Sequence, residues 1–341
     1  MTIMQHQYVD RRTGQVVTER LFGDAVVNAI YSEVREKAPI LYRAAIAKRT
    51  SKLLAFLNYD FTLGTTLSGN RGFLQDSGID FNECVDPPAS LNTARKLFER
   101  KIRYWDCRPM PGFRSAVVSP ADSRMLAGSL EKTDKLFLKG KFFDCEELLG
   151  KPQWLETFRN GDFAIFRLTP DKYHYNHTPV AGIVEDFYEI SGDYHSCNPT
   201  AIVQVATPYS KNKRTVTIIN TDVPGGTEVG IVAMIEVTAL MIGDIVQCYS
   251  STKYDDPQPI ARGMFIERGC PKSLYRPGSS TDVLIFESGR IKFDPDIIEN
   301  MQRTNVQSRF SQGFGRPLVE TDVRIRSRIA VAADREIPYG S

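Results

Sequence analysis

The sequence lacks features that several classes of protein require. Its six cysteines are scattered through 341 residues without a CxxC pair, so neither a disulfide framework nor a zinc ribbon is indicated, and a reducing cytoplasm fits best. The first twenty residues are polar and hold no apolar core of a secretory signal. A net charge of +2 argues against nucleic-acid binding driven by bulk charge.

Long apolar runs are missing too. The longest, residues 229–243 (VGIVAMIEVTALMIG), is too short to cross a bilayer and carries Glu236, so we interpret it as a buried strand. Residues 41–58 (LYRAAIAKRTSKLLAFLN) predict a basic amphipathic helix that packs on the domain, with contact to anionic lipid as the alternative. We therefore expect a cytoplasmic protein whose contact with a membrane is at most peripheral.

The composition of the chain changes after Arg103, from helix-forming residues to short β-prone runs. Residues 21–58 are rich in helix formers, and residues 91–102 indicate a second helix. Beyond Arg103, short β-rich runs recur between turn residues, at 114–120, 161–168, 200–207, 214–220, 229–237 and 282–286, with a late strand within 323–332. We expect an α+β fold, in which a helical region (1–100) precedes a predominantly antiparallel β sandwich or barrel-like core (101–341).

Only four histidines exist, and two of them lie close together in RLTPDKYHYNHTPVAG. These are His174 and His177, which Pro170 and Pro179 bracket, so the segment predicts a loop or turn. A His-x-x-His pair can begin a metal site, but no third ligand stands at a familiar spacing, and we expect no metal.

Asp122 follows an apolar run and a Ser-Pro turn. Alone it would be a turn residue that binds nearby backbone N–H groups. Together with a histidine and a serine at strand edges it supplies the parts of a relay, in which a carboxylate orients an imidazole that deprotonates a hydroxyl. No GxSxG elbow of a conventional serine hydrolase is present, so the hydroxyl must act differently.

Ordered blocks between Arg103 and Ile298 resemble the phosphatidylserine decarboxylase family, whose members make a pyruvoyl cofactor from an internal serine. The blocks are SPADSRMLAGSL, LFLKGKFFDCEELLG, NGDFAIFRLTPDKYHYNHTPVAG, GDYHSCNPTA, NKR and GSSTDVLIFESGRIKF. The family's cleavage motif is Gly-Ser-Thr followed by an apolar run that ends in Phe. Counting back from Phe286 identifies Ser280 as the reactive serine, with Ser279 in the usual glycine position.

The resemblance therefore implies cleavage of the Ser279–Ser280 bond, with Gly278–Ser279 as a competing junction. Chains 1–279 and 280–341 would result, held together by strand pairing. Ser280 Oγ would attack the preceding carbonyl, and the ester so formed would eliminate and hydrolyse to a pyruvoyl group. Such a ketone can take up the electrons left when an amino acid loses carbon dioxide. No phosphate cradle for pyridoxal phosphate is present.

The resemblance also implies roles for the residues already singled out. Asp122 and His177 would activate Ser280, and His174 would serve decarboxylation. We expect His174 to donate a proton or orient the substrate, because the ordinary pKa of histidine lies near working pH.

The expected reaction converts phosphatidylserine to phosphatidylethanolamine and carbon dioxide. A soluble amino acid such as tryptophan is the alternative substrate, because the chain shows no long apolar N-terminal anchor of the kind common in the family. A hydrolase built on Asp122, His174 and His177, or a binding protein that is never processed, remains an alternative of another class. Both predict an unbroken chain.

Other residues are expected to be structural, with a part in the site as the alternative. His195 would be a hydrogen-bonded loop histidine or a substrate contact, and Tyr173 and Tyr175 would pack in the core or line the site. Glu236 would face outward or pair with an arginine. Residues 212–214 (NKR) would form a solvated turn or bind an anionic group.

Overall fold

A ten-stranded sheet lies at the centre of the computed structural model, which describes residues 5–19, 21, 78–130, 142–204, 208–239, 244–277 and 280–333. Its neighbouring strands are antiparallel, except that β1 and β15 are parallel. In spatial order the strands are β11 (Phe265–Ile266), β7 (Gly182–Ile190), β8 (Arg214–Asn220), β9 (Ile231–Thr238), β13 (Ser280–Phe286), β5 (Asp162–Leu168), β4 (Ser123–Ser129), β15 (Thr321–Val323), β1 (Gln7–Asp10) and β2 (Val16–Thr18).

Both faces of this sheet are buried, because its central strands are apolar at successive positions. In β13, Val283 and Ile285 belong to one hydrophobic cluster, and Leu284 and Phe286 belong to another. The first cluster is completed by helices, which are α10 (Cys145–Leu149), α11 (Pro152–Thr157), α12 (Pro199–Gln204), α13 (Pro208–Lys211) and α15 (Arg309–Phe314).

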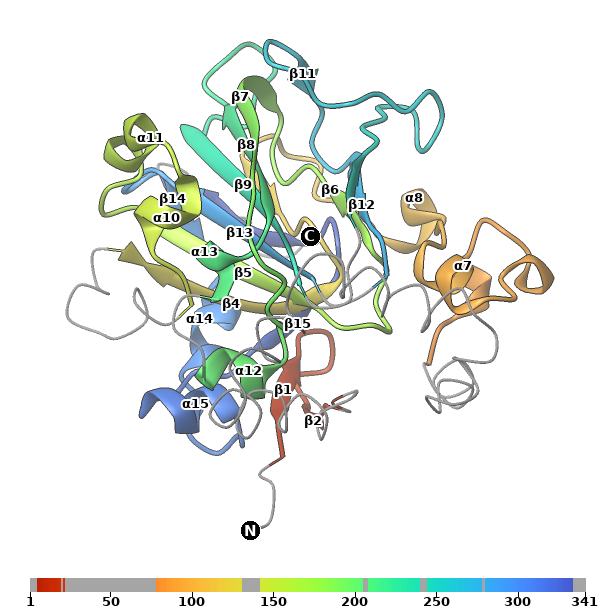
Figure 1. The fold of residues 1–341 in the computed structure, drawn as a ribbon, viewed down its shortest axis with the longest axis vertical. Coiled ribbons are helices and arrows are strands. Elements are labelled where there is room, and N and C mark those ends of the chain that lie inside the picture. The colour runs from red at the N-terminus through yellow and green to blue at the C-terminus, as the bar shows by residue number, and fades with distance from the viewer. Residues whose placement is uncertain are drawn as a thin grey trace.

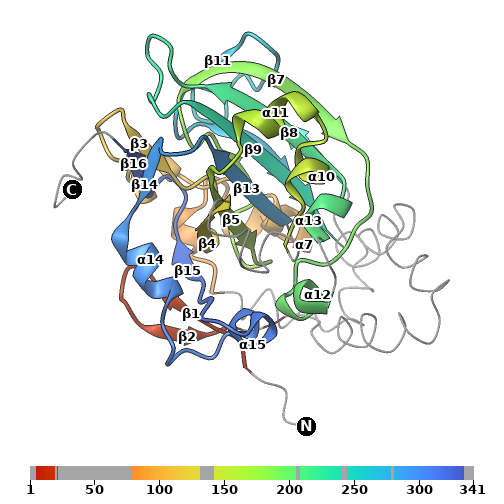
Figure 2. The same cartoon turned by 90° about the vertical axis from the view of Figure 1, so that its left-hand side faces the viewer.

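The opposite face is covered by a small sheet and a helix. The sheet consists of β14 (Ile291–Phe293), β16 (Arg328–Ala332) and β3 (Ala116–Val118), and the helix is α14 (Pro295–Met301). Figure 2 shows this small sheet and helices α10, α11 and α13 on opposite sides of the large sheet. The core is therefore a layered structure with the large sheet in the middle.

A third sheet brings the predicted histidine segment to the start of β13. It consists of β10 (Ile245–Gln247), β12 (Pro271–Tyr275) and β6 (Tyr175–His177). Figure 1 shows β6 and β12 between the large sheet and α8 (Tyr104–Cys107), with α7 (Ala94–Phe98) beyond. Two short 3-10 helices, Phe81–Glu83 and Pro88–Ser90, precede α7.

The prediction of an α+β fold with a predominantly antiparallel core is confirmed, and the described strands close no barrel. Strands lie within all but one of the predicted β runs, and α7 lies within the predicted helix 91–102. The prediction of a strand at 200–207 is wrong, because Pro199 begins helix α12. Thr200 N donates to Asn198 Oδ1 at 2.9 Å, and this cap, with proline at the start, favours a helix over a strand.

The N-terminal region contributes strands that the sequence did not predict. β1 and β2 form a hairpin, and β1 lies beside β15 from the far end of the chain. The predicted helix at 41–58 lies outside the described residues, so the boundary at residue 100 stays a prediction. Within the described ranges, no helix is long and apolar enough to cross a membrane.

Candidate active site

The two clustered histidines lie at β6 and in the segment that leads into it. His177 is the last residue of β6, which pairs with β12, so the expected loop ends earlier than predicted. His174 precedes the strand, and both side chains are fully buried. The backbone N–H of His177 donates to Pro120 O at 2.8 Å, which places β6 next to the turn that carries Asp122.

His177 is held as a neutral base. Its Nδ1 lies 2.9 Å from Gly269 O, and because a carbonyl only accepts, Nδ1 carries the ring proton. Nε2 is then an acceptor, and the Tyr173 hydroxyl donates to it at 3.1 Å. Burial lowers the pKa of His177 to about 3, so the ring is neutral at neutral pH.

His174 has the same protonation but a free acceptor. Its Nδ1–H donates to Lys172 O at 2.8 Å, and its ring stacks on Phe98 with centroids 3.5 Å apart. Nε2 is buried and has no hydrogen-bond partner among the described residues. Burial, together with the charge of Arg100, lowers the pKa of His174 to about 3. The premise that this histidine titrates near working pH is therefore wrong.

Asp122 lies close to this group but binds other residues. Arg108 Nη2 donates to its Oδ2 at 2.8 Å, and Ile325 N donates to its Oδ1 at 2.7 Å. Burial would raise the pKa of Asp122, but the charge and hydrogen bonds of Arg108 outweigh it and hold the pKa below the usual value. Asp122 is thus an ionised buried carboxylate. The hydrogen bonds of His177 go to Gly269 and Tyr173 rather than to Asp122.

Ser280 is the first residue of β13, in the middle of the large sheet. It pairs with Leu168 of β5 on one side and Thr238 of β9 on the other. Its side chain is buried, and Oγ has no hydrogen-bond partner among the described residues. A buried hydroxyl without a partner costs about 1–3 kcal/mol, so such a group needs a reason to exist. The residues expected at the scissile bond, Gly278 and Ser279, lie outside the described residues.

Tyr275, at the end of β12, joins the histidine segment to the start of β13. Its backbone N–H donates to His174 O at 3.0 Å. Its hydroxyl lies 3.0 Å from Thr281 O and 2.8 Å from Asp282 Oδ1. Contacts through Tyr275 and the turn at Pro120 therefore bring the predicted histidines, Asp122 and Ser280 into one region.

Asp282 and its neighbours are site residues that the sequence reasoning missed. Asp282 is buried directly opposite Glu236 of β9, whose carboxylate accepts from Lys272 Nζ at 2.6 Å. Glu236 is thus a buried partner, as one alternative held, but of a lysine rather than an arginine. An acid within the otherwise apolar run TDVLIF was the signal that could have identified Asp282.

The remaining candidates are structural. Asn212 binds the backbone of His195 and donates to Thr238 O at 2.7 Å. Arg214 is buried and donates to Leu148 O at 2.9 Å. Residues 212–214 therefore form neither the solvated turn nor the anion site that were considered. Tyr175 stacks on Tyr173, with centroids 5.5 Å apart, in an aromatic cluster around His177.

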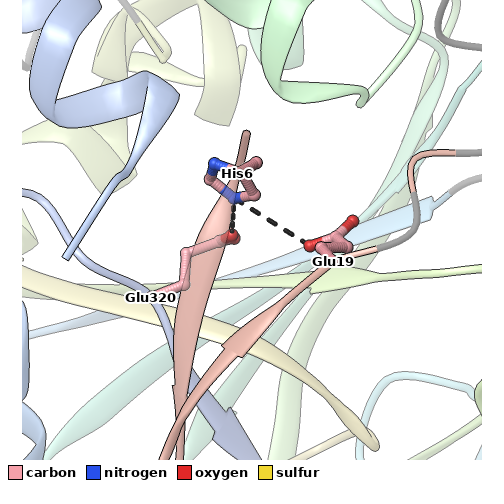
Figure 3. Close-up of side chains that lie close together, drawn as sticks. All are labelled: His6, Glu19 and Glu320. Carbon is pink, nitrogen blue, oxygen red and sulfur yellow. Dashed lines mark hydrogen bonds and ion pairs between the residues drawn. The ribbon is translucent and has the colours of Figure 1, made fainter. Parts of the chain in front are cut away.

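His6, Glu19 and Glu320 form the one group of potential metal ligands found among the described residues, with ligand atoms within 4.8 Å of one another (Figure 3). His6 Nε2 lies 2.8 Å from Glu320 Oε2. Arg167 donates to Glu19 Oε2 and to Glu320 Oε2, each at 2.6 Å. Because the Arg167 guanidinium already binds both carboxylates, the arrangement is a buried ion network rather than a ready cation site.

Known proteins similar to this chain share one description. A family model described as phosphatidylserine decarboxylase matches residues 94–313. The phosphatidylserine decarboxylase proenzyme of Chlamydia trachomatis serovar L2 is 30% identical over 318 residues, which are 93% of this chain and 99% of that protein. The proenzyme of the same name from Fusobacterium nucleatum subsp. nucleatum is 28% identical over 315 residues, 92% of this chain and 97% of that protein. The matched residues include strands β3 to β14 and helix α14, and they contain Asp122, His174, His177 and Ser280. The chain therefore belongs to the phosphatidylserine decarboxylase family.

Proposed function

We propose that this protein is a self-processing, pyruvoyl-dependent decarboxylase that converts phosphatidylserine to phosphatidylethanolamine and carbon dioxide. The observation that carries the proposal is the place of Ser280, a buried, unpartnered hydroxyl at the first residue of a central strand. The relatives are named proenzymes, which fits a chain that must be cut. Substrate and processing are carried over from the family.

In the proposed processing, Ser280 loses its hydroxyl proton and attacks the carbonyl of Ser279. His177 is the base, because its neutral Nε2 is an acceptor and Gly269 fixes its tautomer. Asp122, ionised through Arg108, adds a fixed negative charge that favours a protonated His177 without touching it. Asp122 is thus a positioning residue that acts at a distance, not a direct hydrogen-bond partner.

The surroundings of Ser280 suit a group made from that residue. All seven residues of β13 are buried and paired with both neighbours, so a cut before Ser280 leaves the new terminus anchored in the sheet. The pyruvoyl ketone would supply an acceptor for the electrons released with carbon dioxide. His174 Nε2, neutral and unpartnered, is the atom of this chain that would receive and return a proton there.

The substrate is proposed to be a lipid that the protein meets at a membrane surface from the cytoplasm. The names of the relatives support phosphatidylserine over a soluble amino acid such as tryptophan. Carbon dioxide release from labelled phosphatidylserine in vesicles, measured beside free tryptophan, separates the two. Release from tryptophan alone would reverse the assignment.

Intact-mass spectrometry of the purified protein tests the processing. We expect wild type to appear as chains 1–279 and 280–341, the second with a blocked terminus, and Ser280→Ala to appear as one unbroken chain. Ser279→Ala is the matched control and should still be cut before residue 280. Active wild type with an unbroken backbone would refute the proposal, and cleavage of Ser280→Ala at the same bond would refute the choice of serine.

A further inference from the structure

Asp282 lies on the same face of β13 as Ser280. Side chains alternate along a strand, so Ser280, Asp282, Leu284 and Phe286 share one face and Thr281 lies on the other. Asp282 and Ser280 are both fully buried. Asp282 stands just before the apolar residues VLIF in a strand that is buried throughout, and apolar packing alone gives no reason for an acid there.

This face carries two buried polar atoms without a hydrogen-bond partner among the described residues. Asp282 Oδ1 lies 2.8 Å from the Tyr275 hydroxyl, but Oδ2 has no hydrogen-bond partner among the described residues, and neither has Ser280 Oγ. Residues two apart on a strand are separated by about 7 Å at Cα. At this spacing, we infer that a change of the Ser280 rotamer or one bridging water would join these two atoms. A protonated Asp282 Oδ2 can donate a hydrogen bond, and Ser280 Oγ can accept it.

Burial and a neighbouring charge keep the carboxyl of Asp282 neutral. Complete burial raises the pKa of Asp282 well above its usual value. Glu236 lies directly opposite on β9, where its ion pair with Lys272 leaves it negative, and its repulsion of a second negative charge raises the pKa of Asp282 further. The groups that face it are Tyr275 and Lys272 from β12 and Glu236 from β9, while the β5 residue opposite is Phe166.

We propose that Asp282 is a catalytic residue of self-processing, and that its neutral carboxyl donates a hydrogen bond to Ser280 Oγ as that oxygen departs. The inference rests on the proposed processing at Ser280 and concerns its second step. By then an ester joins the carbonyl of Ser279 to Ser280 Oγ, and the nitrogen of Ser280 is a free amine.

In this second step the electrons and atoms balance within the chain. A base takes the Cα proton of residue 280, the electron pair forms a Cα=Cβ bond, and the Cβ–Oγ bond breaks. Oγ leaves as one oxygen of the new C-terminal carboxylate of Ser279. Negative charge grows on Oγ during this step, and a donor placed there strengthens its hydrogen bond as the charge develops.

The proposal predicts which intermediate accumulates when the donor is removed. Asp282→Val suits the strand and the apolar face, but it has no proton to give. We expect ester formation to proceed and elimination to slow about tenfold or more. Intact mass would then show an unbroken chain that neutral hydroxylamine splits before residue 280, because hydroxylamine cleaves esters and leaves peptide bonds intact. Ser280→Ala must resist hydroxylamine, since it forms no ester.

Two further variants separate chemistry from structure. Asp282→Asn keeps a neutral donor, so it should process within a few-fold of wild type, and Ile285→Val, on the opposite face, should process normally. Timed cell-free synthesis measures the rate of elimination at each pH. This rate should fall for wild type as pH rises through the raised pKa of Asp282, and it should not fall for Asp282→Asn.

Asp282→Val processed at the wild-type rate, or an unbroken Asp282→Val chain that resists hydroxylamine, would overturn the role of Asp282. Either result would leave the choice of Ser280 intact, because that choice depends on the wild-type and Ser280→Ala masses. If Asp282→Val fails to fold by circular dichroism, the comparison of the wild-type and Asp282→Asn pH profiles decides, and identical profiles would overturn the proposal.

Discussion

At the scale of single residues, burial sets the protonation of the site. His174 and His177 are completely buried and their pKa values are lowered to about 3, so neither gains a proton until the solution is strongly acidic. Both rings hold their proton at Nδ1, against backbone carbonyls of Lys172 and Gly269. Both therefore keep Nε2 unprotonated, as a hydrogen-bond acceptor.

We predict that His177→Ala accumulates the full-length precursor. Loss of a general base typically slows a step by about 10²- to 10⁴-fold, so a chain that normally matures during purification should stay unbroken. Denaturing gels and intact mass measure the unbroken fraction. Maturation of this variant at the wild-type rate would remove His177 from the role of base.

His174→Ala should behave differently. Its backbone carbonyl still accepts from Tyr275, so the link to the start of β13 survives the substitution. We predict that this variant matures like wild type and releases carbon dioxide about a hundredfold more slowly. The two measurements are made on the same preparation, and normal turnover by the mature variant would show that the Nε2 of His174 carries no proton.

Sequence could single out these residues as candidates but could not predict their partners. His174, His177, Asp122 and Ser280 stand in short local patterns. Their contacts come from distant segments, since Gly269 lies 92 residues from His177 and Ile325 lies 203 residues from Asp122. Partners so distant in sequence leave no local signal. The sequence therefore could not show that Asp122 binds Arg108 and Ile325 rather than His177.

At the scale of elements, a buried ion pair links β12 to β9, the strand beside β13. Lys272 and Glu236 are both fully buried, with Nζ and Oε2 2.6 Å apart. We predict that Lys272→Met destabilises the protein by roughly 3–5 kcal/mol, because it leaves Glu236 charged and unpaired. The double variant Lys272→Met/Glu236→Leu should recover most of this loss.

Urea unfolding of both variants measures the difference. Arg159→Met is the control, since its ion pair with Glu156 is about two-thirds exposed and should contribute less than about 0.5 kcal/mol. A Lys272→Met protein as stable as this control would mean that the pair does not hold β12 against β9. If the double variant is no more stable than Lys272→Met, the unpaired charge of Glu236 is not the cause of the lost stability.

Elements were predictable where local composition and tertiary position agree. β5, β8, β9 and β13 are long, largely apolar and bounded by turn residues, and each overlaps a predicted run. Residues 200–207 are equally β-prone, but Pro199 and the Asn198 cap begin a helix there, and Ile202 is buried as part of that helix. The short strands β6 and β12 have too few residues to show a period and depend on each other for pairing.

At the scale of the whole molecule, the proposed cut would divide a single interwoven structure. The segment after Ser279 supplies β13 to the middle of the large sheet, β15 to its far part and both β14 and β16 to a second sheet. We predict that the two chains co-elute in gel filtration without denaturant and separate only in urea. Separation under native conditions would contradict the strand pairing seen here.

The N-terminal hairpin is one of the parts of this assembly that the sequence did not predict. Its strands are short, and β1 gains its partner from β15, more than 300 residues away. His6 and Glu19, at the ends of the hairpin, lie beside Glu320 (Figure 3). Arg167 binds both glutamates in this ion network. Only the folded chain reveals that its two ends are joined.

This network should make the association of the cut chains sensitive to acid. Burial would raise the pKa of Glu320, but Arg167 and His6 outweigh it and lower the pKa to about 2, from an ordinary 4.5. A lowered pKa stabilises the folded state above pH 4.5, and this contribution is lost as pH falls toward 2. Glu320→Gln removes the charge, and we predict a loss of about 2 kcal/mol at neutral pH and a flatter decline in acid. Urea midpoints of the cut protein between pH 7 and 3 measure both effects. A Glu320→Gln protein that follows the wild-type curve at every pH would mean that strand pairing alone joins the two chains.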